Sequence, residues 1–179
     1  MASAPVKNRE YGESHPSEMG WPKTLGLLAQ GRNINPETLL ATDYLNHFNE
    51  VVMLIEMSAD MPDCVEDVVC WEPISYEEHF LRSGFAAKEL AVLAYENSPS
   101  KYREPFDMIV EQANRLAGEA ATRLTEAIGD GKNFDPPVVA EMARKYTDTL
   151  RRLVDMASGI IHGHETQTDQ SEIAAILAE

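Results

Sequence analysis

The sequence predicts an all-α fold: an antiparallel bundle of four main helices with an extended N-terminal arm and a short C-terminal helix. Apolar residues recur every three or four positions over long segments, which is typical of helices with one buried face. No stretch alternates between apolar and polar residues as a half-buried strand does, so no sheet is predicted. The loop between the last two long segments is short, and this favours antiparallel neighbours.

The chain divides into three regions. Residues 1–34 are rich in Pro, Gly, Ser and charged residues and are expected to form an extended or mobile arm. Residues 21–28 of this arm are more apolar and are expected to dock on the body or on another subunit. Residues 35–162 form the predicted helical bundle domain, and residues 163–179 a linker with a short C-terminal helix.

The first main helix is predicted over residues 35–59. Asn35 is placed to cap the free amides, and Pro36 suits the first helical position, where no N–H is needed. The apolar residues that follow fall on one side at 100° per residue. The helix is expected to end before Pro62, because the residue before a proline is pushed out of helical geometry.

The second main helix is predicted over residues 75–97. Ser75 and Glu78 match a capping box, in which each side chain satisfies a free backbone amide. The pair Ser83-Gly84 is expected to weaken or kink this helix. The apolar residues after the kink cover much of its circumference.

Two long helices complete the predicted bundle, over residues 104–129 and 135–161. Both keep a three-to-four spacing of apolar residues. Gly129 is placed to stop the first of them. Asp135 is expected to cap the second and Pro136 to open it.

Charge narrows the range of partners. The chain has 15 basic and 30 acidic residues, for a formal net charge of −15. Such a surface repels phosphate backbones and anionic lipid, so neither nucleic acid nor a membrane surface is an expected partner. A basic protein or cations would be favoured. The first twenty residues lack the apolar stretch of a secretory signal. The two cysteines, Cys64 and Cys70, are expected to be reduced thiols in a cytoplasmic protein, and a disulfide between them is the alternative.

The strongest candidate site lies around one histidine. Asp43, His47 and Glu50 stand at i, i+4 and i+7, so they share one side of the first helix. Imidazole and carboxylate groups are suitable ligands for iron, zinc or manganese, and His79 could join them if its helix packs alongside. The alternative is that His47 is a residue at the apolar–polar boundary that hydrogen-bonds Asp43 or Glu50.

A second hypothesis concerns phosphoryl transfer. The segment NHFNEVVMLI, residues 46–55, resembles the HDFNNLL helix of some histidine kinases, in which an exposed histidine accepts a phosphoryl group. When Phe48 and Asn49 are aligned, Asn46 rather than His47 falls at the phosphoacceptor position. No glycine-rich nucleotide-binding segment follows, so the resemblance implies at most a phosphotransfer partner with an exposed His47.

The chain contains no nucleophile elbow, phosphate-binding loop or dinucleotide motif. A non-enzymatic interaction or regulatory role, exerted through protein–protein contacts, is therefore the leading expectation. Metal binding through His47, Glu50 and His79 is the first alternative, and phosphotransfer through His47 the second. Apolar residues at 51–55 and 90–95 exceed the need of one small bundle, which predicts a dimer or another protein partner.

Overall fold

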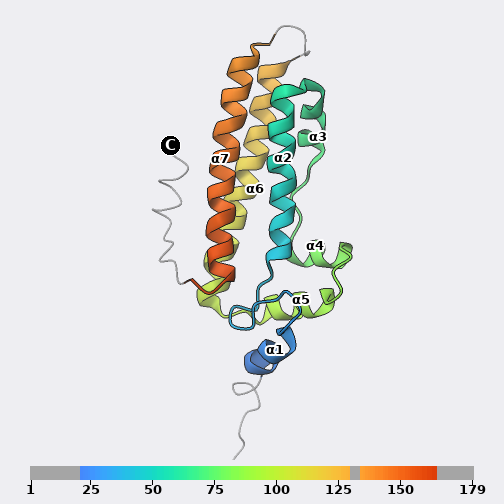
Figure 1. Ribbon diagram of the computed structural model, residues 1–179, viewed down its shortest axis with the longest axis vertical. Helices are drawn as coiled ribbons and strands as arrows, with labels where there is room; N and C mark the ends of the chain where they lie inside the picture. The colour runs from blue at the N-terminus through green and yellow to red at the C-terminus, as the bar shows by residue number, and fades with distance from the viewer. Residues whose placement is uncertain (1–20, 130–133, 165–179) are drawn as a thin grey trace, which may run out of the picture.

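A computed structural model describes residues 21–129 and 134–164 and confirms the all-helical class (Figure 1). The described residues form seven α-helices and two short 3-10 helices, with no strand among them. The elements are, in order, α1 Trp21–Ala29, η1 Thr42–Leu45, α2 Asn46–Asp60, η2 Pro62–Cys64, α3 Val65–Cys70, α4 Tyr76–Arg82, α5 Lys88–Glu96, α6 Ser100–Ile128 and α7 Pro136–Ile161. The predictions for residues 1–20 and for the C-terminal helix lie outside the described residues.

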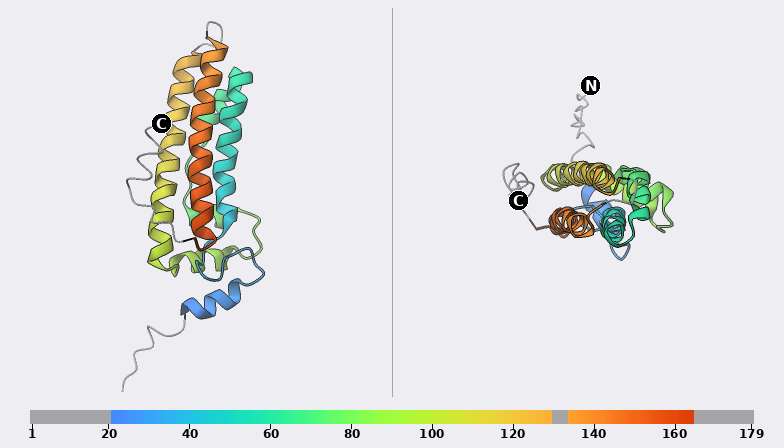
Figure 2. Two further views of the ribbon diagram at one scale, coloured as in Figure 1. Left: turned by 60° about the vertical axis from the view of Figure 1, so that its left-hand side comes forward. Right: turned by 90° about the horizontal axis from the view of Figure 1, so that it is seen from above.

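Three long helices, α2, α6 and α7, pack side by side along the length of the molecule (Figures 1 and 2). Helices α2 and α6 run in the same direction, and α7 runs opposite to both. The short α3 lies beside α6 near one end, while α4 and α5 lie across the other end. Helix α1 packs against α5 at that same end.

The four-helix antiparallel arrangement is not confirmed, because residues 75–97 form two short helices, α4 and α5, in place of one kinked helix. The predicted cap is present: the Glu78 N–H donates to Ser75 Oγ at 3.1 Å. Ser83 then ends α4, since its hydroxyl donates to the Phe80 carbonyl at 2.9 Å and accepts from the Phe85 N–H at 3.1 Å. These bonds turn the chain where a kink was predicted.

The first bundle helix also begins later than predicted, because residues 35–41 form a loop. Asn35 does cap a turn: its Oδ1 accepts from the N–H groups of Glu37 and Thr38 at 2.8 and 3.0 Å. Leu39, however, has a φ of +60°, which no helix tolerates. Its side chain is buried, so packing of this loop offsets the strain of the positive φ.

Thr38 ties this loop to the rest of the molecule. Its hydroxyl donates to the carbonyl of Ile161 at the end of α7, at 2.8 Å. Its carbonyl accepts from the Ser98 hydroxyl between α5 and α6, at 2.7 Å. Thr38 is fully buried, so both bonds are shielded from competing water.

The two longest helices follow their predicted periodicity closely. Helix α6 begins at Ser100, four residues before the predicted start, and ends at Ile128, directly before Gly129, which has a φ of +58°. Helix α7 begins at Pro136 as predicted, although Asp135 makes no capping hydrogen bond with its side chain. Their inner faces are apolar and buried. Within the described ranges, no helix has both the length and the apolar character that crossing a membrane requires.

Candidate functional site

His47 lies in the first turn of α2 with only 7% of its surface exposed. Its ring stacks on Trp71, with ring centroids 4.4 Å apart and planes 22° from parallel. The Ile74 N–H donates to His47 Nε2 at 3.4 Å. Burial, followed by the nearby His79, lowers the pKa of His47 to about 4, so the ring is neutral at pH 7.

His79, on α4, lies close to His47 and Asp43. The rings of His79 and Tyr44 are perpendicular, with centroids 5.5 Å apart, and Tyr44 also lies beside the His47 ring. Burial lowers the pKa of His79, although the Asp43 carboxylate and a hydrogen bond to the Asp43 backbone oppose that shift. The structure thus brings Asp43, His47 and His79 together around Tyr44, while Glu50 is exposed on α2.

This histidine cluster offers few free ligand atoms. The His47 Nε2 lone pair accepts the Ile74 N–H, and the ring face is covered by Trp71. Among the described residues, no group of three or more His, Cys, Asp or Glu side chains is placed to hold a metal ion. The metal hypothesis for Asp43, His47, Glu50 and His79 stays a prediction, which elemental analysis of untagged protein would test.

The burial of His47 also bears on phosphoryl transfer. A phosphoacceptor ring must be reached by the donor, and the resemblance to histidine kinases requires an exposed His47. The ring is instead buried and stacked on Trp71. The condition set by the sequence hypothesis is therefore not met in the folded chain.

A groove between α3 and α6 forms a largely apolar hollow on the described surface of the protein. Its volume is about 480 Å³, which lies in the range of ligand sites. One wall comes from α3 and the segment that follows it: Val68, Val69, Trp71 and Pro73. The other wall comes from α6: Ala117, Gly118, Ala121, Thr122, Thr125 and Glu126. We call this feature the α3–α6 groove.

The α6 wall is made of small side chains. A Cβ atom added at Gly118 would meet no other described atom within 4 Å, so space lies directly in front of this helix. The hydroxyls of Thr122 and Thr125 donate to the carbonyls of Gly118 and Ala121, one turn earlier on α6, at 3.0 and 2.7 Å. Because both hydroxyls are used in this way, these threonines add little free hydrogen-bonding capacity to the groove.

Trp71 joins the groove to the histidine cluster. Its indole stacks on His47 and also lines the groove. Its Nε1–H is buried and has no hydrogen-bond partner among the described residues. An unpaired buried donor of this kind carries a cost in stability. The Trp71 side chain thus connects the core of α2 with the exposed apolar surface.

The chain segment that supplies the α3 wall of the groove contains acidic residues but no Lys or Arg. Residues 33–81 contain eleven Asp and Glu residues but no Lys or Arg. The remaining 19 acidic and 15 basic residues leave only −4 for the rest of the chain. On this segment Glu66 lies one turn before Val69, and Glu72 lies between Trp71 and Pro73. All these carboxylates near the groove are exposed.

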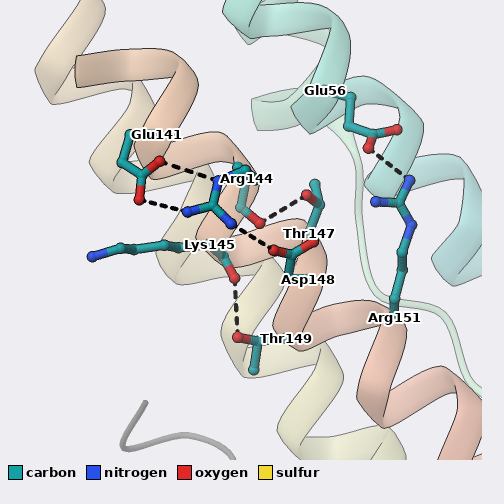
Figure 3. A network of polar contacts seen from close by, with 8 residues as sticks. All are labelled: Glu56, Glu141, Arg144, Lys145, Thr147, Asp148, Thr149 and Arg151. Carbon is teal, nitrogen blue, oxygen red and sulfur yellow. Dashed lines mark hydrogen bonds and ion pairs between the residues drawn. The ribbon is translucent and has the colours of Figure 1, made fainter. Parts of the chain in front are cut away.

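The charges of α7 are arranged differently, as Figure 3 shows. Arg144 pairs with Glu141 at 2.7 Å and with Asp148 at 3.1 Å on its own helix. Arg151 reaches across to Glu56 on α2 at 2.6 Å. Within each of these exposed ion pairs the opposite charges offset each other, and each pair contributes little to stability. This face of α7 is therefore a weaker candidate for a binding surface.

No protein-family model, curated protein or solved structure matches the chain. The site is therefore defined by its own geometry. It is an apolar groove on an all-helical protein, beside a segment that contains acidic residues but no Lys or Arg. The groove residues were not predicted from the sequence. The signals that would have pointed to them are the missing Lys and Arg in residues 33–81 and the small residues at one-turn spacing from Ala117 to Thr125.

Proposed function

We propose that the protein is a non-enzymatic interaction module that binds another protein through the α3–α6 groove. The observation that carries this proposal is an apolar surface that the side chains of residues 21–129 and 134–164 leave uncovered. Val69 is 55% exposed at its edge, and Gly118 faces open space. Exposed apolar grooves of this kind are characteristic of protein-binding sites.

Self-association was the other expected use of exposed apolar residues. Five of the eleven residues behind that expectation are buried, namely Val51, Val52, Ile55, Ala91 and Ala94, while Met53 and Leu93 are exposed singly. The α3–α6 groove gathers Val69, Trp71, Ala117 and Ala121 around one hollow. A partner protein at this groove therefore accounts for the surface better than a dimer through α2 or α5.

The test is site-specific photo-crosslinking in cells that express the chain. A photoreactive phenylalanine replaces Thr122 or Val69 in the groove, and Glu89 on α5 serves as a control position at the other end of the molecule. We expect the same protein to be crosslinked from both groove positions and not from Glu89. The crosslinked protein is then purified for binding measurements.

Binding of that purified partner is compared between wild type, Gly118→Leu and the matched control Gly84→Leu. Both glycines have open space around the added Cβ, so both variants are expected to fold. Filling the groove at Gly118 should weaken binding at least about tenfold, a loss of about 1.4 kcal/mol. Equal binding to Gly118→Leu, or no groove-specific crosslink, would refute the proposal.

A further inference from the structure

The charge beside the α3–α6 groove restricts what can occupy it. Residues 60–78, which contain the whole α3 wall, carry seven acidic residues and no Lys or Arg. Two of these, Glu66 and Glu72, adjoin the exposed apolar residues of that wall. An incoming negative segment would be repelled here, whereas a positive one would be attracted at long range and held at the edge of the groove.

The backbone around the groove restricts the conformation of the occupant. The α6 wall is helical, and its backbone N–H and C=O groups are paired within the helix. The opposite wall combines Val68 and Val69 of α3 with the non-helical Trp71 and Pro73; the Trp71 N–H donates to the carbonyls of Asp67 and Val68, and Pro73 has no N–H. The Thr122 and Thr125 hydroxyls are bonded to their own helix as well. An extended peptide would find few partners for its backbone groups, whereas a helix satisfies them internally.

The α6 wall suits close packing of such a helix. The side chains of Ala117 and Ala121 are small, and Gly118 has none, so the axis of a partner's helix can approach α6 closely. Val69 and Trp71 on the opposite wall provide larger apolar contacts. The groove thus fits one apolar stripe of a helix, with polar residues left at its edges.

Resting on the proposed function, we infer that the α3–α6 groove binds a cationic amphipathic helix of a partner protein. Its apolar stripe packs against Val69, Trp71 and the small residues of α6. Its Lys and Arg residues lie on the side of α3, facing Glu66 and Glu72. The acidic segment from residue 33 to residue 81 selects the sign of the partner's charge and speeds its approach.

Synthetic peptides test this inference directly. The probe is a helix of Leu and Lys, about 18 residues long, with Leu at helical spacing, a length at which an isolated helix is no longer marginal. Two comparison peptides are needed. One has the same composition in strictly alternating order, and the other keeps the helical pattern but replaces Lys by Gln.

Binding is measured by fluorescence anisotropy at about 0.15 M salt, where charges more than about 8 Å apart are largely screened. We expect the Leu/Lys helix to bind at least about tenfold more tightly than either comparison peptide. Amide shifts in NMR spectra should fall on α3 and α6. Gly118→Leu should abolish this preference, and Gly84→Leu should retain it.

Charge variants complete the test. Glu66→Gln with Glu72→Gln should weaken binding of the Leu/Lys helix several-fold. The matched pair Glu89→Gln with Glu96→Gln removes the same charge from α5 and should have a smaller effect. Equal binding of the alternating peptide would show attraction by net charge alone and would overturn the inference.

Equal binding of the Leu/Gln helix would also overturn the inference, because charge would then play no part. In that case the proposed function would still stand, since the groove would bind an apolar helix. The two failures are distinguishable. The proposed function would fail if the natural partner bound the Gly118→Leu variant as tightly as it binds wild type.

Discussion

Among single residues, His47 shows how burial by neighbouring side chains sets the pKa of a histidine. Its ring is held between the core and Trp71, a residue from another segment of the chain. Burial lowers its pKa to about 4 in the folded protein, below the usual value of 6.5. Between these values, the unfolded chain binds a proton that the folded chain does not. The free energy of unfolding therefore falls as the pH falls through this window.

We predict that His47→Phe will flatten this acid dependence. Phenylalanine can stack on Trp71 but cannot be protonated. Between about pH 7 and pH 4, wild type should lose about 2 kcal/mol more stability than His47→Phe, as measured by urea unfolding at several pH values. His79, whose pKa is also lowered by burial, should leave part of the dependence in the variant.

The control for this prediction is His164→Phe, because His164 is an exposed histidine at the end of the described chain. It should show the same pH dependence as wild type. The variants must be compared with one another, because Asp107 has the opposite effect on the pH dependence of stability. Burial raises the pKa of Asp107, so the folded state favours its neutral form and gains stability as the pH falls. If His47→Phe and wild type lose stability in parallel, the role assigned to His47 is wrong.

At the scale of elements, the position of α1 depends on one close approach. A Cβ atom at Gly26 would lie 2.5 Å from the carbonyl oxygen of Pro36, which is too close for contact without a shift of the backbone. Leu25 and Ala29, on the same helix, are fully buried. The lack of a side chain at Gly26 is thus what lets α1 sit against the loop that precedes η1.

We predict opposite effects for two Gly→Ala substitutions. Gly26→Ala should destabilise the docking of α1 by about 1–3 kcal/mol, as overpacking does. Hydrogen exchange over residues 21–29 and trypsin cleavage at Lys23 should both increase. Gly118→Ala should raise stability by about 0.5–1 kcal/mol, since it removes a helix-interior glycine where space is open. An unchanged exchange rate over α1 in Gly26→Ala would contradict the contact described here.

At the scale of the whole molecule, charge is distributed unevenly along the chain. Residues 33–81 carry −11 of the net −15, counting only Asp, Glu, Lys and Arg. Like charges held together in a folded chain repel one another and lower its stability. Salt screens this repulsion between exposed groups. Added salt should therefore raise the free energy of unfolding.

We predict that raising NaCl from about 0.02 to 0.5 M will stabilise the protein by about 1 kcal/mol in urea unfolding, because screening extends to separations of a few ångströms at the higher salt. The gain should shrink in Glu66→Gln with Glu72→Gln. It should change less in Glu89→Gln with Glu96→Gln, because each of these carboxylates has a basic residue nearby: Lys88 precedes Glu89, and Arg103 donates to the Glu96 carbonyl at 3.1 Å. A stability that falls with salt would show that attractive ion pairs dominate.

The helical class and the course of the longest helices could be predicted from the sequence. Spacing of apolar residues along α6 and α7, the Ser75 cap and the stop at Gly129 all depend on residues close together in the chain. Local geometry alone fixes such features. For the same reason, the position of the break at Ser83-Gly84 could be predicted, although the chain there separates α4 from α5 and does not only kink one helix.

The burial of His47 and the α3–α6 groove depend instead on how distant segments pack in the folded chain. Trp71 covers His47 from 24 positions further along the chain, and the two groove walls lie about fifty positions apart. The positive φ of Leu39 likewise depends on a buried loop held by Ile161 and Ser98. Burial and pKa depend on which distant segments meet in space, and helical periodicity carries no information about that pairing.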